Sequence, residues 1–388
     1  MTYSAHYFYY FEPNNPYIWL MIYNWQHQDW PNFIYENSAE GTQIVKYSVN
    51  TGELSGLASG LKSDSKAELM INMLVAEAIK TSEIEGEYFS REDVYSSIEH
   101  NLGLKSNRNS KSLKAKGISE LVVYVHQRFI KPLGKQEILN WHKILMQGYR
   151  NINRGKWRSG ALPMQIVSGT IGKEKVHFEA PPSSRVPKEM QVFMQWFNST
   201  RPGKADEITN PIIRAAVAHI YFESIHPFED GNGRIGRAIA EKALSQGIGQ
   251  PVLFSLSKSI EKNKNQYYNA LKQAQRTLDL TKWIHYFTNL VLDAQETAKQ
   301  EIRFIIKKTQ FYDDHGDQLN ERQAKVIKRM MKSQRFEGGM TAKKYMSITK
   351  VSKATATRDL QILFEQGILV RSGGGRSVSY QVNIDFKK

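Results

Sequence analysis

The residues best suited to chemistry lie in one short segment, His226–Arg237. Its glycines, Gly231 and Gly233, have no side chain that would keep a ligand away from the backbone N–H groups. The apolar pattern of Ile235–Leu244 predicts a helix that begins directly after them. Because a helix N-terminus has unpaired N–H groups and the positive end of the helix dipole, this segment is suited to bind an anion.

Ionisable side chains complete the candidate site. Arg234 and Arg237 are three residues apart on one helical face, and two guanidiniums above such a nest of N–H groups predict a polyphosphate site. Asp230 offers a carboxylate of the kind that Mg²⁺ prefers. His226 has a ring whose pKa suits a general base near neutral pH. Singly, each residue is more often structural, but their grouping within twelve residues favours a functional site over a simple turn.

The segment resembles the signature of the Fic family, His-Pro-Phe-x-Asp/Glu-Gly-Asn-Gly-Arg-x-x-Arg, and matches it at every specified position. Fic enzymes move a nucleotide monophosphate, usually AMP from ATP, onto a hydroxyl group of a protein. The resemblance therefore implies a protein adenylyltransferase in which His226 deprotonates a Tyr, Thr or Ser hydroxyl of the target. It also implies that Asp230 binds a Mg²⁺ ion between the α- and β-phosphates of ATP.

The resemblance further implies which residues contact the nucleotide. Arg234 would neutralise the departing pyrophosphate, and Arg237 would hold the γ-phosphate. Tyr267 and Tyr268 lie where the family stacks aromatic rings on the base and ribose, although core packing explains such a pair equally well. The expected nucleotide-binding residues outside the flap are Glu85, Asp230, Gly231, Asn232, Gly233, Arg234, Gly236, Arg237, Tyr267, Tyr268 and Gln275.

An acidic turn upstream, Thr81–Gly86, fits the family's inhibitory motif Ser/Thr-x-x-x-Glu-Gly/Asn. The resemblance implies that Glu85 pairs with Arg237 and keeps the γ-phosphate from its site, so that the enzyme inhibits itself. The alternative is an acidic helix end that stops at Gly86, but acidic groups there oppose the helix dipole and call for a nearby cation. Such enzymes can also remove AMP, with the glutamate aligning a water, and the sequence leaves both directions open.

A hairpin is predicted beside these motifs. The β-favouring segments Gln165–Val167 and Lys175–Phe178 are followed by a Pro-Pro break. The hairpin resembles the Fic flap, which clamps an extended segment of the target by β-augmentation. The resemblance places Ile166, Val167 and Ser168 nearest the nucleotide.

The elements that position the site can be read from apolar periodicity. The predicted helices cover residues 65–82, 117–130, 135–149 and 187–199. Asn210 and Pro211 begin a further helix as N-cap and first helical residue. The polar, basic residues 104–116 predict a loop or domain boundary. The first 35 residues contain 13 aromatic residues, which we expect to form a small core or to pack on the edge of another domain.

The C-terminal residues predict a separate module. Helical patterns over Glu321–Lys332, Ala342–Tyr345 and Ser352–Gly367 precede a hairpin, which is the order of a winged helix. The candidate DNA-contacting residues are Lys353, Thr355, Thr357, Arg358, Arg371 and Arg376. Residues 301–388 hold 18 Lys and Arg against 9 Asp and Glu, which suits phosphate contact. Docking onto a protein or onto the catalytic core would suit this module as well.

Two classes of function remain open. The first is a nucleotidyltransferase, for AMP or for another nucleotide or phosphate-containing group. The second is a DNA-binding transcriptional regulator that uses its Fic core as a nucleotide sensor. An intact His226 favours the first, because a sensor needs the anion site but no base.

Composition bounds the remaining possibilities. Forty per cent hydrophobic and 23% charged residues exclude a largely disordered or fibrous chain of 388 residues. The absence of cysteine excludes disulfides, thiolate zinc sites and cysteine nucleophiles, and fits a cytoplasmic location. The sequence contains no run of about 18 apolar residues, so it predicts no membrane-spanning helix.

We therefore expect a mainly α fold, with a Fic helical core, a β-hairpin flap and a C-terminal winged-helix domain. The expected partners are a protein with a reactive hydroxyl, the chain itself as a target, DNA, and a second copy in a homodimer. ATP is the expected substrate and Mg²⁺ the expected cofactor. The expected segments are a tail over 1–20, an N-terminal domain with the inhibitory helix over 21–110, the Fic core over 111–300, a linker over 301–318 and the winged helix over 319–388.

Overall fold

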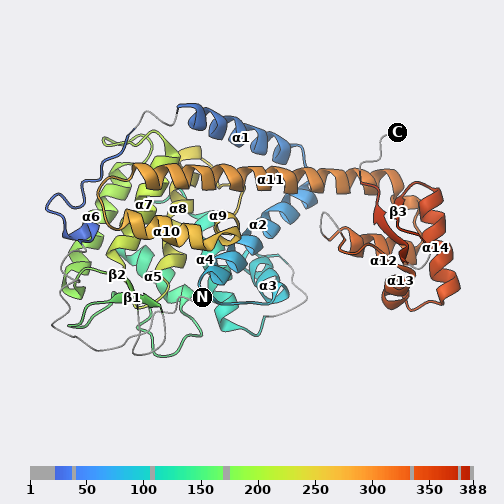
Figure 1. The fold of residues 1–388 in the computed structure, drawn as a ribbon, viewed down its shortest axis with the longest axis horizontal. Coiled ribbons are helices and arrows are strands. Elements are labelled where there is room, and N and C mark those ends of the chain that lie inside the picture. The colour runs from blue at the N-terminus through green and yellow to red at the C-terminus, as the bar shows by residue number, and fades with distance from the viewer. Residues whose placement is uncertain are drawn as a thin grey trace. The chain divides into compact units, whose positions relative to one another are not determined.

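Fourteen α-helices and two antiparallel two-stranded sheets make up the structure, a computed structural model that describes residues 22–36, 41–104, 110–168, 175–332, 336–374 and 377–384 (Figure 1). The fold is mainly α with two small hairpins, as the sequence predicted. The predicted tail over residues 1–20 lies outside the described residues, as does Arg376.

The described chain divides into two compact units. The large unit contains the residues up to Ser55 together with Met70–Ala298, and the small unit contains Gly56–Leu69 and the residues from Lys299 onward. Three helices have residues in both units: α1 (Gly41–Ser59), α2 (Ser63–Ile84) and α11 (Thr281–His315). The other helices of the large unit are α3 (Arg91–Asn101), α4 (Leu113–Gln127), α5 (Lys135–Leu145), α6 (Val186–Ser199), α7 (Pro211–Ile225), α8 (Asn232–Ile248), α9 (Leu256–Lys262) and α10 (Lys264–Ala274).

Helix α7 is the core helix of the large unit. Every residue from Ile212 to its end is buried, as expected of a helix that is apolar on all sides. Asn210 caps it, since its side-chain oxygen accepts hydrogen bonds from the N–H groups of Ile212 (3.0 Å) and Ile213 (3.4 Å), and Pro211 is the first helical residue. Helix α8 packs along α7 (Figure 1), so the segment between the two helices is anchored at both ends.

The predicted flap hairpin is present. Strand β1 (Gln165–Ser168) pairs antiparallel with β2 (Lys175–Glu179), and the register shifts between Ile166 and Val167. Aromatic residues of segment 22–36 pack against strand β2 of the hairpin. The ring of Tyr23 meets Phe178 edge-on, with centroids 5.1 Å apart, and Trp25 Nε1 donates to the Glu179 carbonyl at 2.7 Å. These N-terminal aromatic residues therefore pack on the edge of another element, one of the two arrangements expected.

The small unit contains the predicted helix, helix, helix, hairpin order. Its elements are α12 (Glu321–Met330), α13 (Ala342–Thr349), α14 (Lys353–Glu365), β3 (Leu369–Ser372) and β4 (Ser379–Val382). The hydroxyl of Tyr345 donates to the buried carboxylate of Asp359 at 2.8 Å, and Arg322 Nε donates to the same carboxylate at 3.1 Å. This polar network fixes α14 against α12 and α13.

Two segments differ from the sequence-based description. The predicted loop over 104–116 is in part helical, because Ser112 caps α4 by accepting from Ala115 N–H at 3.2 Å. On that helix Lys116 is exposed, whereas Lys114 is half-buried and pairs with Glu87. The expected linker over 301–318 is helical too, because α11 continues to His315 and a 3₁₀ turn covers Gly316–Gln318. Among the described helices, none combines the length and apolar character needed to cross a membrane.

The close packing of α4 on α5 gives a stability prediction. A Cβ added at Gly117 would lie 2.7 Å from the carbonyl oxygen of Ile144 and 2.9 Å from that of Leu145. Because backbone has to move to admit it, Gly117→Ala should lower the free energy of unfolding by about 1–3 kcal/mol. Thermal unfolding of the whole chain measures this change.

A matched control is Gly52→Ala in α1, where nothing lies within 4 Å of the added Cβ. That variant should keep or raise the melting temperature, since alanine is favoured over glycine inside a helix by up to about 1 kcal/mol. Equal melting temperatures for the two variants would contradict the tight α4–α5 contact.

Candidate active site

The turn after α7 sets the position of His226. This residue ends the helix in the left-handed conformation, with φ 49° and ψ 61°, which is costly for a residue other than glycine. Arg158 stabilises the turn, because its Nε donates to the His226 carbonyl at 2.7 Å and its backbone N–H donates to the Pro227 carbonyl at 2.9 Å. The ring is thereby held in a buried position, with 7% of the residue exposed.

The loop that follows is closed by Asn232. Its side-chain oxygen accepts from the Phe228 N–H at 2.9 Å, and its Nδ2 donates to the Phe228 carbonyl at 2.8 Å. The Phe228 ring is stacked on His142 with centroids 4.0 Å apart. Helix α8 then begins at Asn232, with Gly231 as its N-cap at φ 81°. The predicted glycine-rich helix N-terminus is therefore present and is held rigidly.

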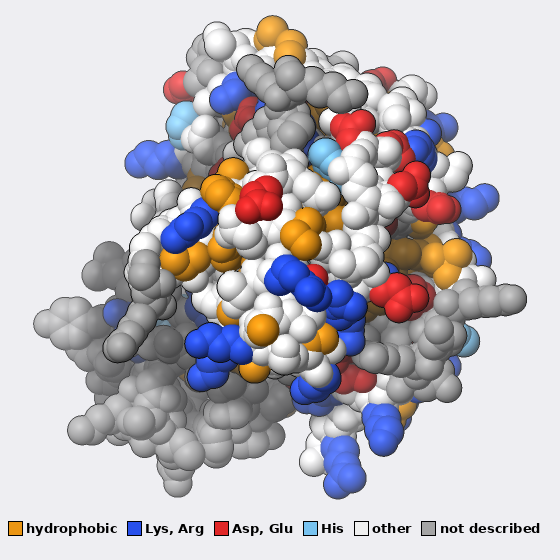
Figure 2. Space-filling model, turned by 90° about the vertical axis from the view of Figure 1, so that its right-hand side faces the viewer, with side chains coloured by type: hydrophobic (Ala, Val, Ile, Leu, Met, Phe, Trp, Pro, Cys, Tyr) orange, Lys and Arg blue, Asp and Glu red, His pale blue; other side chains and the backbone are white. Residues whose placement is uncertain are grey.

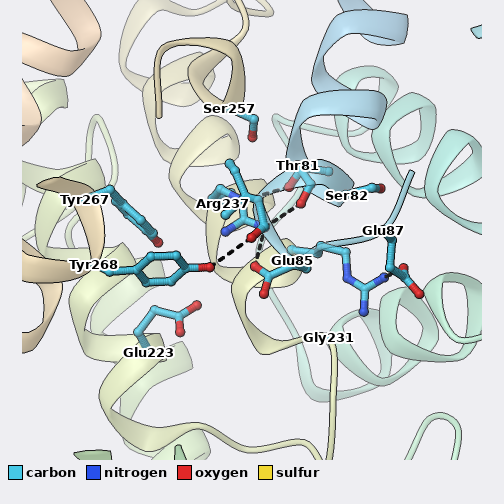
Figure 3. A network of polar contacts seen from close by, with 12 residues as sticks. Thr81, Ser82, Glu85, Glu87, Glu223, Gly231, Arg237, Ser257, Tyr267 and Tyr268 are labelled. Carbon is cyan, nitrogen blue, oxygen red and sulfur yellow. Dashed lines mark hydrogen bonds and ion pairs between the residues drawn. The ribbon is translucent and has the colours of Figure 1, made fainter. Parts of the chain in front are cut away.

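A carboxylate from the end of α2 lies on this helix N-terminus. Arg237 NH2 donates to Glu85 Oε1 at 2.7 Å, and a Cβ added at Gly233 would collide with the same oxygen. Thr81 holds the guanidinium from the other side, with Arg237 Nε donating to its Oγ1 at 2.7 Å. Figure 3 shows Glu85 directed toward Arg237. The anion site at α8 is thus occupied by a side chain of the protein itself.

The second arginine of the segment is also occupied. Arg234 NH1 donates to Glu87 Oε2 at 2.7 Å and to the Tyr149 hydroxyl at 2.6 Å, and Tyr149 donates to Glu87. Lys114 Nζ donates to the other Glu87 oxygen at 2.9 Å. The Arg234 side chain is 2% exposed. Each guanidinium of the predicted polyphosphate site is therefore paired with a carboxylate from one short turn, Glu85–Glu87.

Asp230 lies at the open side of the loop. Its Oδ1 accepts from the Gly231 N–H at 2.5 Å and from Arg234 NH2 at 3.3 Å, while 42% of the side chain stays exposed. No three His, Asp or Glu side chains gather into a metal site within the described ranges. Asp230 therefore fits a cation that takes one carboxylate from the protein and its remaining ligands from phosphate and water, which is the usual arrangement for Mg²⁺.

The aromatic pair is divided between the core and the site. Tyr267 is buried, and its hydroxyl lies 2.8 Å from His219 Nε2, so it packs in the core. The hydroxyl of the half-buried Tyr268 donates to the Ile84 carbonyl at 3.1 Å, directly before Glu85. Gln275 is buried as well, and its Nε2 donates to the Glu223 carbonyl at 3.3 Å. Tyr268 lies beside the anion site (Figure 3). Burial raises the pKa of the Tyr267 hydroxyl, but Tyr267 is close enough to Arg237 for that charge to lower the pKa in part.

The flap residues have different environments. Ile166 packs against the aromatic cluster that includes Tyr23, Trp25 and Phe178. Val167 pairs with Val176 across the hairpin and is half-buried, and Ser168 ends β1 opposite Lys175. Gly236, one turn into α8, faces Glu223: a Cβ there would collide with Glu223 Oε1. Gly236 therefore gives room to a carboxyl rather than to the anion site.

Four residues near the site were not singled out from the sequence: Glu87, Tyr149, Arg158 and Glu223. Two of them had a signal that could have found them. Glu87 follows Glu85 by two residues, and Glu223 precedes His226 by three, which places it on the same face of α7. Arg158 lies in an irregular segment, to which no periodicity pointed. Tyr149 is the last residue of the helix predicted over 135–149, but α5 ends at Leu145, so the pattern did not place its side chain.

Three parts of the chain match known domain families. Residues 23–104 match a domain of unknown function, DUF4172, residues 132–244 match the Fic/DOC family, and residues 322–381 match a DeoR-like helix-turn-helix domain. The chain is 27% identical over 161 residues to a protein adenylyltransferase Fic from Nematostella vectensis. That match covers 41% of this chain and 33% of the relative, so the chain spans about a third of the relative's length.

Solved structures have the same fold. A Fic family protein from Desulfovibrio desulfuricans is 21% identical with a TM-score of 0.50, over 89% of this chain and 97% of that one. A Fic domain containing signaling protein from Bacteroides thetaiotaomicron is 20% identical with a TM-score of 0.51, over 66% of this chain and 97% of that one. The chain therefore contains a Fic/DOC domain and, at its C-terminal end, a DeoR-like helix-turn-helix domain.

The pairing of Arg234 gives a binding prediction. An anion that reaches Arg234 has to displace Glu87, so Glu87→Gln should strengthen the binding of inorganic pyrophosphate. The expected gain is about 10-fold if the competing ion pair is worth about 1.4 kcal/mol. Isothermal titration of the full chain with pyrophosphate measures it.

The control for this measurement is Glu83→Gln. Glu83 lies just before that turn, at the end of α2, but pairs with Lys80 at 2.5 Å, so its loss should leave the affinity as in the parent protein. Unchanged affinity in Glu87→Gln, or an equal change in both variants, would contradict competition at Arg234.

Proposed function

We propose that this chain, which carries a Fic/DOC domain and a C-terminal DeoR-like helix-turn-helix domain, transfers AMP from ATP to a hydroxyl group of a protein and is held inactive by Glu85. One observation carries the proposal. The Glu85 carboxylate lies over Gly233 and pairs with Arg237 at 2.7 Å, where a phosphate of the substrate would bind. An anion site blocked by the protein's own anion is expected of an enzyme that controls access of a polyphosphate.

The proposed reaction uses the groups of the loop in turn. The N–H groups of Gly231, Asn232 and Gly233 would bind phosphate oxygens at the start of α8. The target hydroxyl would lose its proton to a ring nitrogen of His226. The hydroxyl oxygen would then form a bond to the α-phosphorus of ATP. The bond from that phosphorus to the bridging oxygen would break, and pyrophosphate would leave toward Arg234. Such transfers depend on positioning and charge stabilisation.

Asp230 would hold the cation that this chemistry uses. A bound Mg²⁺ supplies neutralisation of the α- and β-phosphate charges. The exposed part of the Asp230 carboxylate supports this assignment, because a cation can reach it. The phosphates of ATP would complete the coordination.

Inhibition by Glu85 follows from competition for one guanidinium. Burial alone would lower the pKa of Arg237, but the charges around it, Glu85 first among them, raise that pKa above its ordinary value. The guanidinium thus keeps its charge, and an approaching γ-phosphate has to replace the carboxylate. The same carboxylate would align a water for the reverse reaction, removal of AMP from a modified target, which belongs to this proposal as its second direction.

The flap and the target fit this proposal. Strands β1 and β2 form a two-stranded sheet, to which an extended segment of a target protein could add by β-augmentation. A hydroxyl on that segment, or on the chain itself, would be the acceptor of AMP.

DNA binding by the small unit is a second candidate function. Helix α14 exposes Lys353, Thr357 and Arg358 to solvent, whereas Thr355 is half-buried, and Arg371 is exposed on β3. Figure 2 faces the side of the molecule that carries α13 and α14, and Lys and Arg side chains lie close together there. The match to a DeoR-like helix-turn-helix domain supports this function, which would direct the transferase to a site or a partner.

Release of the inhibitory pair tests the transferase proposal. Glu85→Gly should incorporate about 10- to 100-fold more AMP than the parent protein, because about 1.4 kcal/mol of lost competition corresponds to one factor of ten. Incorporation from α-labelled ATP with Mg²⁺ measures the rate, and intact-mass analysis with each nucleoside triphosphate identifies the group transferred.

Two further variants control that experiment. Glu85→Gly with His226→Ala should bind ATP but transfer nothing, since a base contributes about 10²–10⁴ in rate, and Glu85→Gly with Arg237→Ala should lose the gain. Equal incorporation by the parent and Glu85→Gly, or activity that persists in a chelator, would count against the proposal.

The DNA proposal has its own test. Lys353→Ala with Arg358→Ala should weaken binding to a mixed-sequence duplex and reduce the dependence of log affinity on log salt by about one to two. Fluorescence anisotropy of a labelled duplex measures both quantities. Lys188→Ala, which removes an exposed cation from α6, is the control, and an effect of equal size there would leave α14 without a role in DNA binding.

A further inference from the structure

A buried carboxyl group lies behind the ring of His226. Glu223 Oε2 is 3.8 Å from His226 Nδ1, and the two side chains are 4% and 9% exposed. Within the part of the chain that the structure describes, Glu223 Oε1 and His226 Nδ1 make no hydrogen bond. Two unpartnered polar groups this close together are costly to bury, so a contact between them in the working enzyme would remove a penalty as well as supply a function.

The chemistry assigned to His226 needs such a partner. Burial, and after it the positive charge of Arg158, lower the pKa of the His226 ring to about 3, which the Glu223 carbonyl only partly offsets. A ring with so low a pKa holds a proton poorly, yet a general base has to hold one in the transition state. An anion at Nδ1 would stabilise the imidazolium and leave the other ring nitrogen free to act.

We propose that Glu223 is the positioning residue for His226: its carboxylate accepts a hydrogen bond from Nδ1–H, so that Nε2 is the base, and it offsets the charge of the imidazolium that forms. The proposal rests on the proposed function of the site. A change of side-chain rotamer that shortens the separation by about 1 Å gives an ordinary hydrogen bond. Gly236, which has no Cβ, leaves the space that the carboxyl occupies. In this step Nε2 of His226 takes up the proton of the target hydroxyl and Nδ1 keeps its proton. Glu223 neither gains nor loses a proton.

The groups around Glu223 make this contact depend on pH and on the inhibitory turn. Burial raises the pKa of Glu223 to about 8, Arg237 of α8 lowers it and Glu85 at the end of α2 raises it. The Tyr267 and Tyr268 side chains of α10 lie near Glu223 (Figure 3), and burial, together with the charge of Glu223, raises the pKa of both hydroxyls. His219 on α7 lies beside Gly236, as Glu223 does. At pH 7 the group is therefore mostly protonated while Glu85 is present, and it becomes a carboxylate as the pH rises through about 8.

Departure of Glu85 would thus have two effects. It frees Arg237 for phosphate, and it removes a negative charge that keeps Glu223 protonated. The pKa of Glu223 should then fall, and the carboxylate needed behind His226 should form at lower pH. Glu85 would in this way control the base as well as the anion site.

The ring of His226 reports this directly, without any need for activity. We would follow its ¹⁵N shifts by NMR from pH 6 to 10 in the nucleotide-free chain and identify the signals by their absence in His226→Ala. The parent should show an inflection near pH 8 with Nδ1–H favoured above it, and Glu223→Gln should lack the inflection. The same tautomer and titration in both proteins would overturn the proposal, because the backbone carbonyl of Glu223 would then be the only anchor.

The rate should follow the same titration. In the Glu85→Gly background, the rate of AMP incorporation should rise with pH and then level off at a plateau. Adding Glu223→Gln should remove this rising limb and lower the plateau rate on the order of 10-fold or more. Glu241→Gln is the matched control, because Glu241 is a buried carboxyl with a raised pKa that faces Glu77 rather than His226, and its pH profile should keep the limb. A limb that survives in Glu223→Gln would overturn the proposal.

These measurements distinguish a failure of the proposed AMP transfer from a failure of the role proposed for Glu223. Absence of AMP transfer in every variant would refute the proposed function, while the ring titration would still decide whether Glu223 holds His226. Circular dichroism melts of Glu223→Gln and Glu241→Gln show whether each variant is folded. If Glu223→Gln unfolds, Glu223→Asp takes its place and should shift the inflection instead of removing it, and an unshifted inflection would contradict the proposal.

Discussion

The ion pair between Glu85 and Arg237 is the interaction on which the arrangement of the site depends. It joins the end of α2 to the first turn of α8, although the two residues are far apart in the sequence. Both partners are shielded from water, with 1% of the Arg237 side chain and 25% of the Glu85 side chain exposed. A charge pair in such surroundings is strong only if its remaining hydrogen bonds are satisfied. Thr81 satisfies part of them, since it accepts from Nε and NH2 of Arg237, whereas NH1 makes no hydrogen bond among the described residues. The helix dipole of α8 adds to the attraction.

Buried polar side chains around this pair fix the backbone of the large unit near the site. Arg158 binds the carbonyl groups of Ile225, His226 and Pro181, and so ties the turn after α7 to the segment that follows β2. Asn232 closes the loop between α7 and α8. Each of these groups would be expensive to bury without partners. The apolar packing of α7 supplies the rigidity that keeps them in register, so the fold and the site stabilise each other.

The carboxyl groups of the site fall into two sets with different roles. Glu85 and Glu87 come from one turn after α2 and pair with the two arginines of α8. Glu223 precedes His226 along the chain and Asp230 follows it. Asp230 is partly exposed, whereas Glu223 is buried, and burial raises its pKa to about 8. Under the proposed function, one set would control access to the anion site, and the other would serve the cation and His226.

The sequence by itself predicted the candidate residues of the site and the order of the elements. The spacing of residues along the chain is local information. It was therefore possible to predict, without coordinates, the segment His226–Arg237, the N-cap at Asn210, the flap hairpin and the order of the C-terminal elements. Tertiary structure alone decided which distant groups meet: that Glu87 and Tyr149 bind Arg234, that Arg158 holds the His226 carbonyl, and that Tyr267 packs in the core.

The physical reason for this division is burial. A side chain's pKa and partners depend on what packs around it, and packing joins residues with no relation in sequence. Glu223 lies three residues before His226 and was visible in the sequence. Only the contact of α7 with α8 and with the end of α2 makes it a buried carboxyl beside a base, because only there do desolvation, Arg237 and Glu85 act on it together.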